Sequence, residues 1–411
     1  MTETGNLRID AERLWNSLME MARIGATARG GSARLALSDL DREGRDLFVR
    51  WCQEAGCTVE IDRMGNIFAR RPGRRPDLPA VATGSHLDTQ PTGGKFDGVY
   101  GVLAGLEVIR TLNDADFATE APIEVTVWTN EEGARFAPAM VASGVFAGVF
   151  TEAYGHSRAD LDGKTIGEEL KRIGYLGELP VGGRPFKAFF EAHIEQGPVL
   201  EAEGRTIGVV LGIQAMRWFE VTLTGQESHA GTTPMARRRD AMLGCGRMME
   251  RINRIALDHP PGVSTVGLVK VSPNSRNTIP GTVLFSVDLR HPSDEDLLKM
   301  KAALERALDE TCQASGLTYE CIEVWHSPAV RYHEDCIAAV RAAASAAGYR
   351  HMDIVSGAGH DAGYINRVAP AGMIFVPCAD GISHNEVESA TREDLAAGCN
   401  VLLHAMLARA T

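Results

Sequence analysis

The sequence lacks three features, and each absence excludes a class of protein. No apolar run in the 411 residues is long enough to cross a bilayer, and residues 1–5 show no signal-peptide pattern, which predicts a cytoplasmic protein without a membrane partner. The chain also has no excess of positive charge, because its formal net charge is -12, so we expect no nucleic-acid partner. Its eight cysteines form no Cys-x-x-Cys pair, and we assign them no chemistry.

The overall composition is that of an ordinary globular enzyme. Hydrophobic residues make up 44% of the chain and charged residues 23%. Since 411 residues exceed what one hydrophobic core usually serves, two domains are expected.

Residues 84–98 place a histidine and two aspartates in a glycine-rich turn that follows an apolar run. Residues 79–83 predict a short buried strand, so His86 and Asp88 would follow its carboxyl end, where open α/β sheets bind ligands. His86 offers a ring nitrogen to a metal, Asp88 can hydrogen-bond the other ring nitrogen, and Asp97 adds an oxygen ligand. Taken alone, the stretch is also compatible with a polar loop that holds a structural histidine.

Three further apolar runs end in similar side chains: residues 123–128 before Glu131 and Glu132, residues 186–192 before His193, and residues 372–377 before His384. Adjacent carboxylates are usually a solvated face, and a single histidine is more often structural than ligating. Four repeats of one arrangement make coincidence a poor explanation. Five nitrogen and oxygen ligands exceed the needs of one tetrahedral zinc and suit two metals that share a bridging aspartate. Glu132 would ligate, while Glu131 would accept a proton from water.

A region of different composition, residues 213–328, separates the third run from the fourth. Its pattern predicts a βαββαβ order typical of ferredoxin-like domains, with strands at 218–224, 264–271, 283–289 and 318–324 and helices at 239–257 and 295–314. We therefore expect a catalytic domain formed by residues 1–212 and 329–411, interrupted by an inserted α+β domain.

The inserted region contains three polar sites, namely residues 225–234, residues 273–281 and Arg290. Each is compatible with ordinary turn chemistry. A small domain that closes over a metal cleft would instead use them to complete the site, because closure excludes water.

Residues 84–89 with 94–98, then residues 130–136, 191–197 and 357–362, together resemble the metal-dependent hydantoinase/carbamoylase amidases, relatives of the dinuclear aminoacylases and carboxypeptidases. The resemblance covers nearly the whole chain. It implies an α/β fold with a mixed-sheet, dinuclear metallopeptidase-like catalytic domain and an inserted ferredoxin-like domain that acts as lid and dimerisation domain.

The resemblance also implies roles for individual residues. His86 and His193 would bind one metal, Asp97 would bridge, and Glu132 and His384 would hold the second metal. Glu131 matches the general base and Asp88 the partner of the first histidine. The substrate residues of the family fall on Gln196, His229, Asn277 and Arg290, with further matches at Arg217 and the turn Gly357, Ala358 and Gly359.

Side-chain chemistry agrees with these substrate roles. Arg290 offers a planar fork for a carboxylate, and His229 and Asn277 can donate to the oxygen that becomes negative in a tetrahedral intermediate. In relatives the histidine that matches His229 comes from the partner subunit, so a homodimer is expected. His360 and Asp361 are expected to support their turn rather than to bind metal.

The expected reaction is hydrolysis of an N-carbamoyl amino acid to the amino acid, ammonia and carbon dioxide, with two divalent ions as cofactors: zinc, or manganese, cobalt or nickel. Residues 90–97 and 127–132 look most similar to the branch with β-ureidopropionases, enzymes of pyrimidine degradation, and N-carbamoyl-L-amino acid hydrolases. Alternatives are an allantoate amidohydrolase, a dinuclear aminoacylase or peptidase, and a binding module without catalysis. Glu131 argues against the binding module, since a binding protein needs no proton acceptor beside metal-held water.

Overall fold

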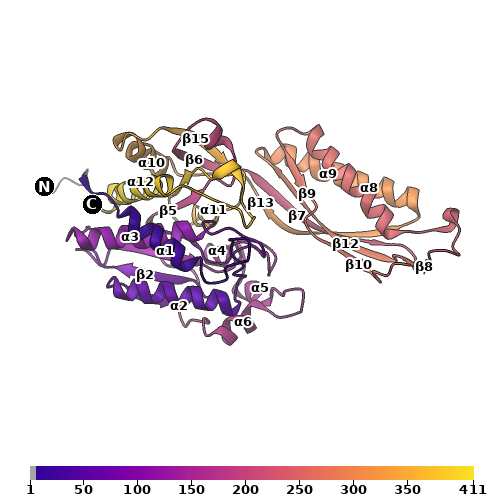
Figure 1. The fold of residues 1–411 in the computed structure, drawn as a ribbon, viewed down its shortest axis with the longest axis horizontal. Helices are drawn as coiled ribbons and strands as arrows, with labels where there is room; N and C mark the ends of the chain where they lie inside the picture. Colours follow the sequence, from indigo (N-terminus) through magenta and orange to yellow (C-terminus); the bar gives the residue numbers. More distant parts are fainter. Residues whose placement is uncertain (1–5) are drawn as a thin grey trace. The chain divides into compact units, whose positions relative to one another are not determined.

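The protein divides into two compact units in a computed structural model that describes residues 6–411 (Figure 1). Unit 1 combines the described part of Met1–Gly212 with Arg331–Thr411, and unit 2 is Ile213–Val330. Each unit has its own sheet and its own helices.

Unit 1 is built on a mixed sheet of nine strands in the order β1-β2-β4-β3-β5-β16-β6-β14, with β15 paired to β6. The strands are β1 (Thr58–Ile61), β2 (Ile67–Arg71), β3 (Ala80–His86), β4 (Ile123–Trp128), β5 (Phe186–Ile194), β6 (Ile207–Ile213), β14 (Val330–Arg331), β15 (His351–Ser356) and β16 (Ala371–Val376). The four neighbouring strands β4, β3, β5 and β16 run parallel to one another, whereas β2 and β6 flank them antiparallel. These four are the apolar runs from which the sequence predicted a common site.

Helices cover both faces of this sheet. On one face, α3 (Val99–Asp114) packs on β3 and β5 and is itself covered by α1 (Ala11–Met21) and α12 (Arg392–Ala410), so nearly all of its side chains are buried. The other face carries α4 (Val141–Phe146), whose Phe146 lies against Trp128, Phe68 and Phe186. The remaining helices of unit 1 are α2 (Asp39–Glu54), α5 (Glu152–Ser157), α6 (Ile166–Ile173), α7 (Val199–Ala202), α10 (Glu334–Ala346), α11 (Asp361–Ile365) and η3 (Ala379–Gly381).

The start of α2 has the Ser and the acid, three residues apart, of a capping box, in which each side chain bonds the backbone N–H of the other residue. Ser38 caps α2 by accepting a hydrogen bond from the backbone N–H of Asp41. The Asp41 carboxylate does not return this bond to Ser38, because it accepts from the N–H of Leu37 and pairs with Arg45 inside the core. The capping box is therefore half formed.

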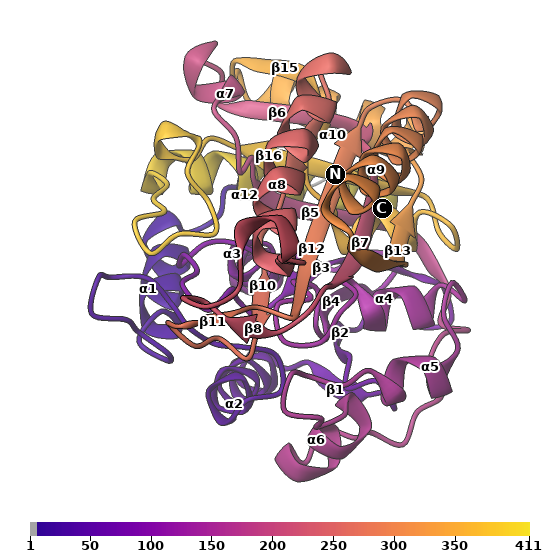
Figure 2. The same cartoon turned by 90° about the vertical axis from the view of Figure 1, so that its right-hand side faces the viewer.

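Unit 2 has an antiparallel sheet in the order β10-β12-β7-β13, with β9 also paired to β12. Its elements are β7 (Ala215–Thr224), α8 (Ala241–Asp258), β9 (Val263–Thr265), β10 (Val269–Ser272), β12 (Thr282–His291), α9 (Asp294–Ser315) and β13 (Thr318–Ser327), together with the short β8 (Ser228–His229), η2 (Met235–Arg237) and β11 (Thr278–Ile279). The two long helices lie side by side on one face of the sheet (Figures 1 and 2). Alternate residues of β7 and β12 point into the core beneath them, as a pleated strand requires.

The second strand expected in this region, residues 264–271, is broken into β9 and β10. Between them the N–H of Leu268 bonds to the side-chain hydroxyl of Ser286 instead of to a backbone carbonyl, next to Gly267, which has no side chain to pack.

Within residues 6–411, none of the helices combines the length and the hydropathy that a bilayer crossing demands.

Candidate metal centre

The carboxyl ends of the parallel strands bring the predicted metal ligands of unit 1 together. His86 is the last residue of β3, and His193 lies near the end of β5, opposite Phe375 of β16. The sequence placed both histidines beyond their strands, but each belongs to the strand itself. Glu131 and Glu132 follow β4, and His384 follows β16.

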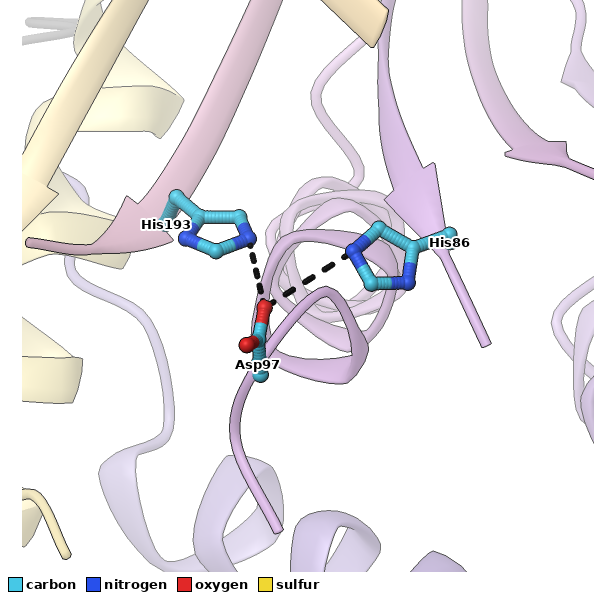
Figure 3. A group of neighbouring side chains, drawn as sticks. All are labelled: His86, Asp97 and His193. Carbon is cyan, nitrogen blue, oxygen red and sulfur yellow. Dashed lines mark ion pairs between the residues drawn. The ribbon is translucent and has the colours of Figure 1, made fainter. Parts of the chain in front are cut away.

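A first ligand group consists of His86, Asp97 and His193, all buried (Figure 3). The Nε2 atom of His193 lies 3.2 Å from Oδ1 of Asp97, and Nε2 of His86 lies 3.8 Å from the same oxygen. Two imidazole nitrogens and one carboxylate oxygen thus converge on one point.

A second ligand group consists of Asp97, Glu132 and His384. Here Nε2 of His384 lies 3.4 Å from the other Asp97 oxygen, Oδ2, and 3.3 Å from Oε2 of Glu132. His384 is 49% exposed, so this group opens toward solvent. Each carboxylate oxygen of Asp97 therefore faces a different ligand group, which is the arrangement of a bridging ligand.

The donor atoms fit two divalent cations. They are nitrogens and carboxylate oxygens, the donors that zinc, manganese, cobalt and nickel accept. Several carboxylates are buried side by side here, and this is costly unless a positive charge compensates them. Gln196 also indicates that a further group binds here. Its Nε2 donates to Asp97 Oδ2, while its buried Oε1 has no protein partner.

A third cluster, Glu191 with His193 and His360, has ligand atoms at similar separations. The two oxygens of Glu191 already accept hydrogen bonds from Ser85 Oγ and from the N–H of Ala362. Because protein donors satisfy this carboxylate, the cluster does not require a cation.

Both ligand histidines are oriented by backbone carbonyls. Nδ1 of His86 lies 2.8 Å from the carbonyl oxygen of Asp88, and Nδ1 of His193 lies 2.9 Å from that of Ile194. The N–H of Gly98 donates to Nε2 of His193, so this Nε2 carries a lone pair and Nδ1 carries the proton. The backbone thus selects the tautomer that a metal ligand needs.

The hydrogen bond predicted for the Asp88 side chain is made by its backbone carbonyl instead, since the carboxylate lies 4.0 Å from His86 Nδ1. The Asp88 carboxylate points to the next strand end and accepts from the N–H groups of Glu131 and Glu132, each at 3.3 Å. Asp88 therefore links the His86 turn to the acidic pair.

Glu131 stands beside the first ligand group, with Oε2 3.5 Å from Nε2 of His86. Burial, followed by the charges of Asp361, Glu132, Asp88 and Asp97, raises the pKa of Glu131 well above its usual value. A raised pKa makes this carboxylate a stronger proton acceptor than an exposed glutamate, which is the property that a general base requires.

The turn Gly357, Ala358 and Gly359 follows β15, and Ser356 closes it by hydrogen bonds to the carbonyl and N–H of Ala358. The adjoining His360 lies against the ring of His193, with ring centroids 4.6 Å apart. Asp361 accepts from Ser143 Oγ. In this structure both residues are engaged by protein groups.

Sequence reasoning missed Glu388 and Ser383. Glu388 is buried, and its Oε1 accepts from the N–H groups of Phe96 and Asp97 at 3.0 and 3.1 Å. Ser383 Oγ lies 2.9 Å from Glu388 Oε2 and 3.0 Å from Asp97 Oδ2. Burial, together with the nearby charge of Asp97, raises the pKa of Glu388 to about 7.

The sequence holds one signal for this role. A side chain on Gly94 would place its Cβ 2.0 Å from the Glu388 carboxyl carbon, so the second glycine of the Gly93-Gly94 pair leaves room for that carboxylate.

Two of the predicted substrate residues lie together in unit 2. β8 and β11 pair so that His229 is opposite Thr278, and the N–H of Ala230 bonds to the carbonyl of Asn277. Nδ1 of His229 accepts from the N–H groups of Gly231 and Thr232, which leaves the ring proton on Nε2. The exposed His229 is thereby set up as a hydrogen-bond donor.

The two predicted arginines of unit 2 point to opposite faces of its sheet. Arg217 is opposite Leu289, a core residue beneath the helices, and it pairs with Glu323 at 2.7 Å. Arg290, one residue along β12, points to the other face, where Nε and Nη2 bond to Asp288 at 3.0 and 2.7 Å. One substrate carboxylate therefore cannot contact both arginines of the same unit 2.

Comparison with known proteins bears on the whole chain. Residues 82–408 match the model of peptidase family M20/M25/M40. The chain belongs to this family. The mixed α/β fold expected from the sequence is thereby confirmed for this M20 protein.

Relatives of this M20 protein include an N-carbamoyl-L-amino-acid amidohydrolase from Rhizobium meliloti, 53% identical over 98% of this chain and 97% of the relative. An allantoate amidohydrolase from Bacillus subtilis is 33% identical over 93% of each chain. The crystal structure of a hydantoinase/carbamoylase family amidase from Burkholderia vietnamiensis is 61% identical, with a TM-score of 0.98 over 98% of both chains. These similarities confirm the resemblance read from the motifs.

Proposed function

We propose that this M20 protein hydrolyses the carbamoyl C–N bond of N-carbamoyl-L-amino acids and releases the amino acid, ammonia and carbon dioxide. The observation that carries the proposal is Asp97, whose two oxygens face separate ligand groups with Glu131 beside them. The substrate class follows from the relative that shares 53% of its residues and is named for this reaction.

Two divalent ions would be held by the two ligand groups, one by His86 and His193, the other by Glu132 and His384, with Asp97 between them. When bound, these ions supply Lewis-acid activation and make hydroxide available near neutral pH. Zinc is the metal we propose, and the same donors accept manganese, cobalt or nickel.

Proton transfer falls to Glu131. Its Oε2 accepts a proton from the attacking water and then delivers it to the leaving nitrogen. The buried Glu131 is suited to this, because its raised pKa lets it hold the proton between the two steps. The Asp88 carboxylate, bonded to the N–H groups of Glu131 and Glu132, keeps the acidic pair in position.

Substrate binding would use residues from both units. Arg290 would anchor the substrate carboxylate, while His229 Nε2 and Asn277 would donate to the developing oxyanion. Gln196 and the Gly357–Gly359 turn would complete the site in unit 1. Both arginines have a carboxylate partner, Glu323 for Arg217 and Asp288 for Arg290, so the face of the sheet decides between them: we leave Arg217 out because it points to the face that the helices cover.

We further propose a cytoplasmic homodimer that associates through unit 2, with His229 acting in one of the two active sites. Unit 2 supports this by its exposed apolar side chains, among them Leu243, Leu257, Val263, Leu298 and Ile322. A contiguous patch of such residues would suit an interface between two copies.

The deciding experiment compares substrates at matched concentrations: an N-carbamoyl-L-amino acid, N-carbamoyl-β-alanine, allantoate, an N-acetyl-L-amino acid and a dipeptide. We expect the highest kcat/KM for the first substrate. One methylene changes binding by about 1–3 kcal/mol, so N-carbamoyl-β-alanine should be roughly 10 to 200 times poorer. Faster turnover of allantoate would favour the activity named for the 33% identical relative, and faster turnover of the acetyl or peptide substrate would overturn the carbamoylase assignment.

Glu131→Gln tests the proton transfer separately. The amide keeps the shape of the side chain but cannot accept a proton, so kcat should fall by about 10²–10⁴-fold while both metals stay bound. Metal content by elemental analysis is the control. Unchanged kcat in a fully loaded variant would remove Glu131 as the base.

A further inference from the structure

Unit 1 contains a cavity of about 250 Å³ that is separate from the ligand groups of the metal centre. It lies at the base of the segment that joins β16 to α12, and its wall includes residues 377–379 and 389–391 from the two ends of that segment. The N–H of Ala379 bonds to the carbonyl of Ser389 and closes this base. The same segment carries Ser383, His384 and Glu388.

Two arginines line one side of the cavity. The paired strands β6 and β15 lie side by side (Figure 2). The carbonyl of Arg350 accepts from the N–H groups of Thr206 and Ile207, so Arg205 and Arg350 lie at the adjoining starts of these strands. The Nη1 atom of Arg350 lies over Gly204, within 3.6 Å of where a Cβ would be.

Neither guanidinium group has a protein partner within residues 6–411, and Nε of Arg205 is buried without an acceptor. A buried donor of this kind is rare in folded proteins, and an anionic ligand is one reason for its presence. Two like charges side by side add to the attraction for an anion.

Two carboxylates, Glu201 and Asp394, line the same cavity. Each is engaged locally: Glu201 accepts from the N–H of Asp380, and Asp394 accepts from Thr391 Oγ1. Neither forms an ion pair with Arg205 or Arg350 among the described residues. Opposite charges therefore share one cavity without neutralising each other, and a ligand that carries both charges complements them.

We infer that this cavity binds a small free amino acid, with the carboxylate on Arg205 and Arg350 and the ammonium group toward Glu201 and Asp394. The planar guanidinium fork matches a carboxylate, and carboxylate oxygens accept the three ammonium donors. A small amino acid fits within about 250 Å³.

Binding there fixes both ends of the segment that carries His384. A ligand stabilises the conformation it binds, so an amino acid in this cavity holds His384 in place and slows loss of the ion that His384 helps to retain. Its role as a product signal rests on the proposed function, because the amino acid is the product of the proposed reaction. Binding itself is independent of the reaction.

Calorimetric titration of the zinc-loaded protein with L-alanine tests the inference. The wild-type protein should bind one more L-alanine per chain than Arg205→Gln or Arg350→Gln. Arg341→Gln is the matched control, since Arg341 is also an arginine of unit 1 but pairs with Asp353 and does not line the cavity. Equal stoichiometry and affinity in all four proteins would overturn the inference.

The ligand class is tested with acetate and inorganic phosphate and with Asp394→Asn. Removing the carboxylate should weaken L-alanine at this site about tenfold or more without weakening acetate, because only the amino acid carries an ammonium group. If phosphate occupies the site as tightly as L-alanine, the cavity recognises any small oxyanion and the amino-acid assignment is wrong.

A chelator experiment tests the link to the metal centre. L-alanine should slow release of zinc to a chelator in the wild-type protein and in Arg341→Gln, but less so in Arg205→Gln. If L-alanine slowed zinc release equally in the wild-type protein and both variants, it would act only by binding at the active site, and the cavity would have no link to the metal centre. Because zinc release is measured without turnover, this result does not depend on whether the carbamoylase assignment is correct.

Discussion

Replacing Glu388 with alanine tests whether the bridging aspartate is held by a residue that does not itself ligate. The carboxylate accepts from the N–H groups of Phe96 and Asp97 and contacts Ser383, which in turn contacts Asp97 Oδ2. Its removal leaves two buried N–H groups without partners, and each unsatisfied group costs about 1–3 kcal/mol of folding free energy. Asp97 then loses its fixed position between the two ligand groups.

The expected effect on metal binding is large. Residues that orient metal ligands typically contribute about 10–100-fold in affinity, so Glu388→Ala should weaken binding by that factor. Because Asp97 faces both ligand groups, both ions should be affected, not one. Competition between the protein and a chelator of known affinity, followed for each ion in turn, measures this.

Two variants serve as controls. Glu388→Gln keeps an acceptor for the two N–H groups and should lose much less affinity. Glu386→Ala removes a carboxylate from the same segment that pairs with Arg29 rather than with the Asp97 turn, and it should bind metal normally. If Glu388→Ala kept both ions with wild-type affinity, or weakened only one, the positioning role would be refuted.

Three further predictions concern the centre and its substrate. Gly98→Ala should abolish metal binding, because Gly98 has a φ of 66° and a Cβ there would lie 2.3 Å from the His86 ring. Gly148→Ala is the control, since Gly148 has a similar φ of 72° but open space around it. Its loss of stability on thermal unfolding, about 1–3 kcal/mol, measures the cost of the backbone conformation alone. Chelation should abolish activity and added zinc, manganese, cobalt or nickel should restore it, whereas activity that persists in metal-free protein contradicts the mechanism. Arg290→Ala should raise KM and Arg217→Ala should not; equal rises, or an equal loss on a substrate without the carboxylate, would argue against anchoring by Arg290.

The strands and the ligand set were predictable because both have local signals. Apolar runs of strand length identify β3, β4, β5 and β16, and each is followed within a few residues by an acid or a histidine. Parallel strands present their carboxyl ends at one edge, so strand positions alone bring distant ligands together. His86, Asp97 and His193 converge for this reason.

The contacts that hold those ligands were not predictable. Glu388 bonds to Phe96 and Asp97, which are 292 and 291 positions away along the chain, and nothing next to Glu388 in the sequence marks its carboxylate as different from any other in a polar segment. The role of Asp88 was misread because spacing alone does not show whether the side chain or the backbone carbonyl reaches the imidazole. The break between β9 and β10 depends on the hydroxyl of Ser286 on a neighbouring strand.

The position of β16 has a consequence for how the molecule matures. Among the nine strands of this sheet, β16 comes last in the sequence and is therefore synthesised last. It nevertheless lies between β5 and β6, which precede it by many residues. A nascent chain that ends after unit 2 thus lacks the strand that pairs with both β5 and β6, and it lacks His384. The second ligand group needs His384 and the contacts to Phe96 and Asp97 need Glu388, so a chain that ends after unit 2 can form neither.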